Sequence, residues 1–118
     1  ADFGAGSILI AFGAVLGKLN IFEYTTMALI QSIIYGLQFV LCFVVLGALD
    51  LGGSITIHLF GAIFGVIVSL MIKNEKAINH PNNTSNYNSN LFSMIGTIFL
   101  FLYWPSFNGA FGKDHSQH

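Results

Sequence analysis

The chain contains three long runs without a single Asp, Glu, Lys or Arg, at residues 24–49, 51–72 and 91–112. An α-helix rises about 1.5 Å per residue, so each run is long enough to cross the ~30 Å hydrocarbon core of a bilayer. A shorter apolar run covers residues 3–17. None of the runs has the strict alternation of apolar and polar residues that is typical of a membrane β-barrel. The sequence therefore predicts an all-α, polytopic membrane bundle with four transmembrane helices, at about 3–18, 24–49, 54–72 and 91–107.

Composition excludes the main soluble classes. Apolar residues make up 54% of the chain and charged residues only 8%, whereas a soluble domain has about a quarter of its residues charged. The four basic residues are all lysines, and the net charge is −1. Nucleic acid requires a strongly basic face, so we expect no nucleic-acid partner. The lipid bilayer is the solvent that fits this composition.

The lysines predict the orientation of the helices. Lys18 follows the first predicted helix, and Lys73 and Lys76 follow the third, so up-and-down threading places them on one side of the membrane. The other side receives mostly acidic residues, namely Asp2, Asp50 and Asp114, with Lys113. Cytosolic loops are enriched in lysine and arginine. We therefore predict that the Asn-rich loop 73–90 is cytosolic.

The same loop contains two overlapping glycosylation sequons, which begin at Asn82 and Asn83. Used sequons lie in lumenal or extracellular loops, so they argue for the opposite orientation. Short sequons also arise by chance in a segment rich in Asn, Ser and Thr. We give the lysines more weight, and the use of Asn82 or Asn83 stays open.

The third predicted helix contains the chemically informative residues. Asp50 stands where a helix N-cap is expected, and Gly52-Gly53 allows a sharp turn of the backbone. His58 follows inside the apolar run. At helical spacing the small and weakly polar residues of this helix share one face, namely Ser54, His58, Gly61, Ala62, Gly65 and Ser69. Gly61 and Gly65 also form a small-xxx-small pair that favours close helix contact.

An ionisable residue within a membrane helix is costly and commonly functional. His58 has two interpretations that the residues alone leave open: a pore-lining group, or a structural histidine hydrogen-bonded to a neighbouring helix. Burial disfavours the imidazolium form, and a neutral imidazole donates and accepts hydrogen bonds without a fixed charge. We interpret His80, His115 and His118 as solvated loop residues. No cluster of Cys and His ligands accompanies any of them, so we predict no metal site and no cofactor.

Two features concern the extent of the chain and its cysteine. The sequence has no initiator Met, and its first residues already read as part of an apolar helix. We therefore expect a fragment of a larger membrane domain. Cys42 is the only cysteine, and we expect it to be an apolar packing residue.

Several long motifs resemble the Rhesus glycoproteins of the ammonium transporter superfamily. The first is DLGGSITIHLFGAIFG at residues 50–65. The others are ADF with SILIAFGAVLGK near the start, and LFSMIGTIFL with YWPSFN at 91–108. These motifs stand in the family's order and span nearly the whole chain. Residues 24–46 and the Asn-rich loop match only loosely.

The resemblance implies roles for four residues. His58 matches the first of two pore-lining histidines, and the second belongs to a later helix that this sequence does not contain. Phe3 and Phe107 match the two stacked phenylalanines that gate the outer vestibule. Asp50 matches an aspartate that supports the backbone near the outer entrance. The implied fold has eleven or twelve helices in a homotrimer, and the implied function is conduction of ammonia or ammonium through a hydrophobic pore, with methylammonium or CO2 as further solutes.

Other classes of function remain open at this point. One alternative is a CO2 or other gas channel, or a non-conducting Rhesus-like membrane scaffold protein. Another is an unrelated secondary transporter, for which Gly52-Gly53 would mark a broken helix with an ion site. An intramembrane enzyme would need a nucleophile with a base, or metal ligands, within the spans. Neither pattern is present in the sequence, so we predict that the chain is not an enzyme and has no catalytic residue.

Overall fold

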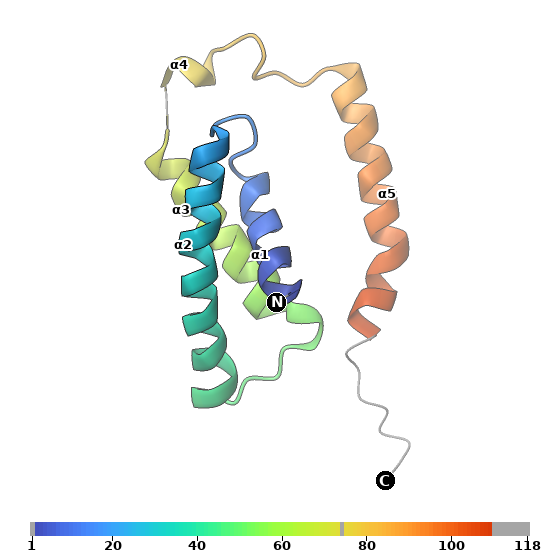
Figure 1. The fold of residues 1–118 in the computed structure, drawn as a ribbon. Helices are drawn as coiled ribbons and strands as arrows, with labels where there is room; N and C mark the ends of the chain where they lie inside the picture. The colour runs from blue at the N-terminus through green and yellow to red at the C-terminus, as the bar shows by residue number, and fades with distance from the viewer. Residues whose placement is uncertain (1, 74, 110–118) are drawn as a thin grey trace. The chain divides into compact units, whose positions relative to one another are not determined.

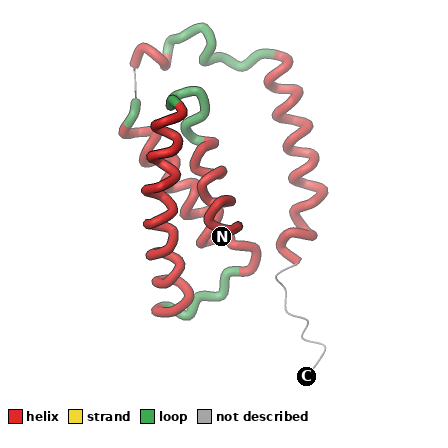
Figure 2. Tube along the Cα trace, in the orientation of Figure 1, coloured by secondary structure: helices red, strands yellow, loops and turns green. Residues whose placement is uncertain are grey.

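The computed structural model of the protein describes residues 2–73 and 75–109, without the side chains at 76 and 77. Every regular element in these two ranges is helical (Figure 2). The helices fall into two units, residues 1–73 and 74–118, which are described separately. The all-helical fold agrees with the class predicted from the charge-free runs.

The first unit contains the helices α1 (Asp2–Gly13), α2 (Ile21–Val40) and α3 (Phe60–Met71). A π-helical segment, Leu41–Val45, continues α2. A 3-10 turn, Leu51–Gly53, and a second π-helical segment, Ser54–Leu59, lead into α3. Helix α1 packs against both α2 and α3, and its larger contact is with α3 (Figure 1). The second unit contains the short α4 (Glu75–Ile78) and the long α5 (Tyr87–Gly109).

Three of the helices are long and apolar enough to span a membrane. They are Ile21–Val45 with 25 residues, Leu51–Met71 with 21 and Tyr87–Gly109 with 23. The fourth predicted span corresponds to α1, which has only 12 residues. At about 1.5 Å per residue, 12 residues cover about 18 Å of the ~30 Å core. The described part of α1 is therefore an apolar helix shorter than a full span.

The boundaries of α1 and α2 differ from the predicted ones for local reasons. Helix α1 ends at Gly13 and not near residue 18, because backbone bonds from Ala14 to Ala11 and from Val15 to Phe12 tighten the chain into turns. Helix α2 begins three residues before its predicted start. A capping box explains the earlier start: Asn20 Oδ1 accepts from the Glu23 amide, and Glu23 Oε2 accepts from the Asn20 amide.

Other boundaries also shift. Apolarity alone predicted that the second helix continues to residue 49, but it ends at Val45. Gly47 follows with a φ of +60°, a left-handed conformation that commonly ends helices. Helix α5 begins at Tyr87 and not at 91, because Asn86 Oδ1 accepts from the Ser89 amide and caps the helix. Within the predicted loop 73–90, residues Glu75–Ile78 form α4.

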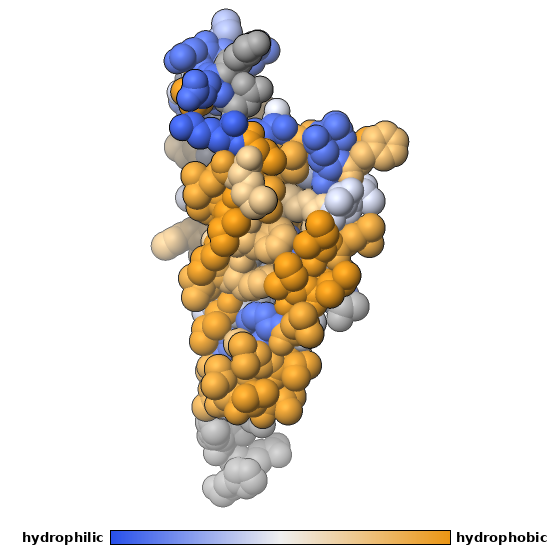
Figure 3. All heavy atoms as spheres, turned by 90° about the vertical axis from the view of Figure 1, so that its left-hand side faces the viewer, coloured by the Kyte–Doolittle hydropathy of each residue, from blue (hydrophilic) through white to orange (hydrophobic). Residues whose placement is uncertain are grey.

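The core of the first unit is small and surrounded by exposed apolar side chains. Ala11, Val15 and Met27 are buried together, while α2 and α3 present rows of exposed Leu, Ile, Val and Phe residues. Figure 3 shows these hydrophobic side chains covering most of one face. Exposed apolar surface of this extent is expected where lipid or further helices are the surroundings.

One polar contact shows at which end of the unit the turn between α1 and α2 lies. The Lys18 ammonium donates to Ser69 Oγ at 2.7 Å, near the end of α3. Lys18 therefore lies at the same end of the unit as the C-terminus of α3, as the alternating threading of the spans requires. The assignment of that end to the cytosol stays a prediction.

Candidate pore-lining site

The segment from Asp50 to His58 folds around two glycines. Gly52 and Gly53 are buried and have φ values of +73° and +68°, which glycine adopts without a steric penalty. A Cβ on Gly53 would overlap the side chain of Ile57. The pair therefore makes the sharp turn that the sequence predicted, and it directs the chain from the loop after α2 into the third helix.

Asp50 caps the helix that follows this turn. Its Oδ1 accepts from the Ile55 amide at 2.9 Å, and its Oδ2 accepts from the Thr56 amide at 2.8 Å and the Thr56 hydroxyl at 2.7 Å. Asp50 stands at the predicted N-cap position, but its side chain makes no capping hydrogen bond to the 3-10 turn there and reaches over it to amides five and six residues along the chain. Burial alone would raise the pKa of Asp50, but these hydrogen bonds together lower the pKa below its ordinary value.

His58 lies in the π-helical segment Ser54–Leu59, about a third of the way along the span Leu51–Met71. Its Nδ1 lies 3.1 Å from the Gly53 carbonyl oxygen, and its side chain is half-buried. A carbonyl oxygen can only accept, so this contact requires a proton on Nδ1 and orients the ring. In the neutral imidazole, Nε2 is then the acceptor. Single π-helical turns occur frequently at functional sites.

The predicted small face of the third helix is divided in the structure. Gly61 and Gly65 are buried against α1, where an added Cβ would lie 2.6 Å from the carbonyl oxygens of Ser7 and Ala11, respectively. Ser54 and Ala62 are exposed instead. The π-helical segment bonds i to i+5, so it rotates Ser54 away from the position that regular α-helical spacing predicts. The glycine pair makes the close helix contact that its spacing indicated.

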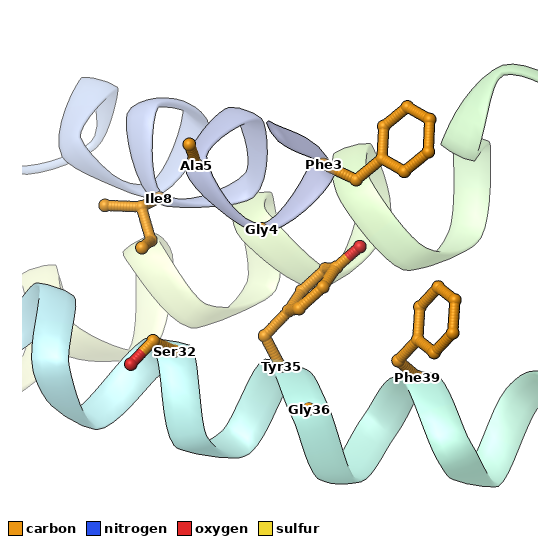
Figure 4. Close-up of a pocket in the computed structure, with 8 residues that line it drawn as sticks. All are labelled: Phe3, Gly4, Ala5, Ile8, Ser32, Tyr35, Gly36 and Phe39. Carbon is orange, nitrogen blue, oxygen red and sulfur yellow. The ribbon is translucent and has the colours of Figure 1, made fainter. Parts of the chain in front are cut away.

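Phe3 lies in the first turn of α1 and has 42% of its surface exposed. It borders an open pocket of about 560 Å³ between α1 and α2 (Figure 4). The pocket is mostly apolar and is lined by Phe3, Gly4, Ala5, Ile8, Ser32, Tyr35, Gly36 and Phe39. Phe107 belongs to α5 in the other unit, where its ring stacks on Trp104 with centroids 5.5 Å apart. The pairing of Phe3 with Phe107 stays a prediction.

Sequence reasoning missed a polar stripe on α2. Gln31, Tyr35 and Gln38 follow one another at intervals of four and three residues, which places them on one helical face. Gln31 is fully buried, and its amide nitrogen donates to the Ser7 carbonyl oxygen at 3.0 Å. In the described part of the chain, Gln31 Oε1, the Tyr35 hydroxyl and Gln38 Oε1 are buried without a hydrogen-bond partner. The spacing alone was the signal that would have revealed this stripe.

The remaining candidates are the possible metal ligands and the cysteine. Within residues 2–73 and 75–109, no three His, Cys, Asp or Glu side chains lie close enough together to hold a metal ion. His115 and His118 lie outside the described residues, as do Lys113 and Asp114. Cys42 is a free, half-buried thiol whose Sγ accepts from Gln38 Nε2 at 3.3 Å.

The fold and the position of His58 define an integral membrane protein with several spanning helices and an ionisable group inside one of them. The model of the ammonium transporter family matches residues 1–117. The chain belongs to the ammonium transporter family. This is a family of transporters, which agrees with the prediction that the chain is not an enzyme.

Similar curated proteins refine this placement. The chain is 47% identical to the ammonium transporter Rh type B of Rattus norvegicus over 111 residues, which cover 93% of the chain and 24% of that protein. It is 46% identical to the proteins of the same name from Pongo pygmaeus and Xenopus tropicalis, again over 93% of the chain and 23% and 24% of the relatives. The chain thus spans about a quarter of the length of these relatives. No solved structure matches it.

Proposed function

We propose that this chain forms part of a hydrophobic conduit through which ammonia crosses a membrane, with His58 lining the conduit. The observation that carries the proposal is the environment of His58. The ring is oriented by the Gly53 carbonyl in a π-helical turn of a membrane span. Membership of the ammonium transporter family supplies the solute class. The Rh type B relatives are named as ammonium transporters.

The physical chemistry favours a neutral conducted species. Moving a bare ion into hydrocarbon costs far more than moving a neutral molecule that can hydrogen-bond. Ammonium that loses its proton near the entrance becomes ammonia, which needs only hydrogen-bond partners to replace water. With Nδ1 held by Gly53, Nε2 of a neutral His58 accepts a hydrogen bond from an N–H group. The ring therefore replaces part of the lost hydration without presenting a fixed charge.

Phe3 and Asp50 take the entrance roles in this proposal. The half-exposed Phe3 ring borders the open pocket of α1 and α2, and in this proposal it acts with Phe107 as the phenylalanine gate that the resemblance implies. Asp50 supports the backbone beneath His58, because both of its carboxylate oxygens are used by donors of the turn. The negative charge of Asp50 would attract an ammonium ion electrostatically, while the carboxylate keeps its hydrogen bonds to those donors.

The test is stopped-flow measurement of internal pH in proteoliposomes that contain the full-length parent protein. An ammonium pulse should alkalinise native vesicles faster than empty ones, and His58→Ala should change that rate. His80→Ala is the matched control, because His80 lies exposed in the loop after α4 and should leave the rate unchanged.

Each contrary outcome has a definite meaning. Native vesicles that alkalinise no faster than empty vesicles would contradict ammonia conduction and leave a membrane scaffold. Fast CO2-driven acidification without fast ammonia entry would favour the gas channel instead. An ammonia rate that His58→Ala does not change would remove His58 from the conduit.

A further inference from the structure

Tyr35 lines the pocket that Phe3 also borders, and the sequence analysis assigned it no role. It stands on α2, about midway along Ile21–Val45. Its ring borders the pocket that Phe3 also borders, and Figure 4 shows it extending from α2 toward α1 near Gly4. The same ring packs edge-on against Phe60 of α3, with centroids 6.0 Å apart. A single side chain therefore contacts or borders all three helices of the first unit.

The backbone of α1 comes within about the width of a methyl group of the Tyr35 ring. An added Cβ on Gly4 would meet ring atoms of Tyr35 at 3.4 and 3.5 Å, which is ordinary van der Waals distance. Gly4 is the residue next to Phe3, in the first turn of α1. The position of the Tyr35 ring therefore limits how closely the first turn of α1, and Phe3 with it, approaches α2.

The hydroxyl end of Tyr35 does not explain why a tyrosine stands here. The oxygen is buried and has no hydrogen-bond partner among the described residues. The Thr56 hydroxyl donates its proton to Asp50. A buried hydroxyl without a partner costs free energy, so the packing of the ring is the feature that stabilises this arrangement.

We propose that Tyr35 is a positioning residue that sets the location of Phe3, and thereby determines how strictly the entrance discriminates between ammonia and methylamine. The inference rests on the proposed function, in which Phe3 narrows the conduit. Ring contacts with Phe39 and Phe60 hold the Tyr35 side chain, and Gly4 lies close to the same ring. A smaller, flexible side chain at position 35 would leave more space beside Gly4, and the first turn of α1 would shift toward it, because the structure around a lost side-chain volume relaxes in part.

The test compares the permeability for ammonia with that for methylamine in proteoliposomes of the full-length parent, by stopped-flow pH after matched ammonium and methylammonium pulses. Tyr35→Leu should lower the ammonia-to-methylamine ratio by about tenfold, the order of discrimination that one methylene supports in an apolar site. Tyr35→Met, which retains more volume, should lower it in the same direction. Tyr35→Phe keeps the ring and should retain the native ratio.

The control and the double variant separate positioning from general destabilisation. Tyr24→Leu removes a tyrosine from the same helix, whose ring packs on Phe12 and whose hydroxyl donates to Val15. It should lower the melting temperature and leave the ratio unchanged. Because Tyr35 acts through Phe3, adding Tyr35→Leu to Phe3→Leu should cause no further change in the ratio.

The outcomes distinguish this inference from the proposed function. If native protein conducts ammonia and Phe3→Leu shifts the ratio, but both Tyr35→Leu and Tyr35→Met keep the native ratio, the positioning role is wrong. Fully additive effects of Tyr35→Leu and Phe3→Leu would also overturn it. If native protein does not conduct, the proposed function fails first, and the inference fails with it.

Discussion

At the scale of single residues, the Asp50 side chain stabilises the local backbone through its hydrogen bonds. Its carboxylate accepts two amide hydrogen bonds and one hydroxyl hydrogen bond. Losing a helix cap costs about 0.5–2 kcal/mol, and hydrogen bonds to charged groups are stronger than neutral ones. We expect Asp50→Ala to lower the free energy of unfolding of the parent protein by about 2 kcal/mol. Melting in detergent measures this loss. Glu75→Gln, at an exposed position, is the control that should leave stability unchanged.

The lowered pKa of Asp50 predicts a pH dependence of the same residue. A carboxyl group whose folded pKa lies below its unfolded value of about 3.9 stabilises the fold fully above that value. This contribution is lost as the pH falls through the folded pKa. The native protein should therefore lose more stability than Asp50→Asn when the pH is lowered from about 5 to 3. Parallel melting curves for the two proteins across that range would contradict the assignment.

At the scale of elements, the contact between α1 and α3 depends on two glycines. A Cβ on Gly65 would lie 2.6 Å from the Ala11 carbonyl oxygen and 2.8 Å from its Cα. Backbone atoms cannot move aside as a flexible side chain can, so Gly65→Ala should separate the helices. We expect it to destabilise the protein by about 1–3 kcal/mol, the usual cost of overpacking.

Gly36→Ala is the matched control for Gly65→Ala in the contact between α1 and α3. Gly36 lies inside α2, and an added Cβ there meets nothing within 4 Å. Alanine lowers the entropy cost of a helix interior, so this variant should be neutral or more stable by about 0.5–1 kcal/mol. The two substitutions are chemically identical and should differ in sign. Equal melting temperatures would show that α1 and α3 are not closely packed at Gly65.

At the scale of the whole molecule, the chain spans about a quarter of the length of its relatives. In α5, no residue from Tyr87 to Gly109 is buried, and α2 and α3 expose many large apolar side chains. These surfaces need lipid or additional helices around them. Assembly as a homotrimer, which the resemblance implies, stays a prediction, and cross-linking of the full-length parent in native membranes tests it.

A prediction for the chain by itself follows from the same surfaces. Residues 1–118 expressed alone should enter membranes through their apolar spans but should not raise ammonia permeability above that of empty vesicles. A conduit needs walls on all sides, and His58 is only half-buried in the first unit. Stopped-flow pH measurements on vesicles with this chain, beside the full-length parent, check the expectation. Fast alkalinisation with the short chain would show that it forms a pore unaided.

The sequence alone determined that the chain lies in lipid and that it is an all-α membrane protein. It also determined which segment contains the residues most informative about function. Charge-free runs of about 20 residues leave lipid as the environment, and the DLGGSITIH motif indicated the capping acid, the glycine turn and the intramembrane histidine. The helix ends were predicted less well, because apolarity cannot separate a helix from an apolar turn. The capping box at Asn20 was readable and overlooked, whereas the turns after Gly13 depend on backbone geometry.

The tertiary structure decided which side chains meet. The position of Ser54 outside the buried face of the third helix follows from a π-helical turn, which no spacing rule for regular helices predicts. Tyr35 lies close to Gly4 and packs against Phe60, although these residues are far from it in the chain. A local pattern fixes what a helix can bury, because periodicity is a property of one segment. Which surfaces lie against one another is fixed only when the helices pack, because van der Waals contact depends on the shapes of both partners.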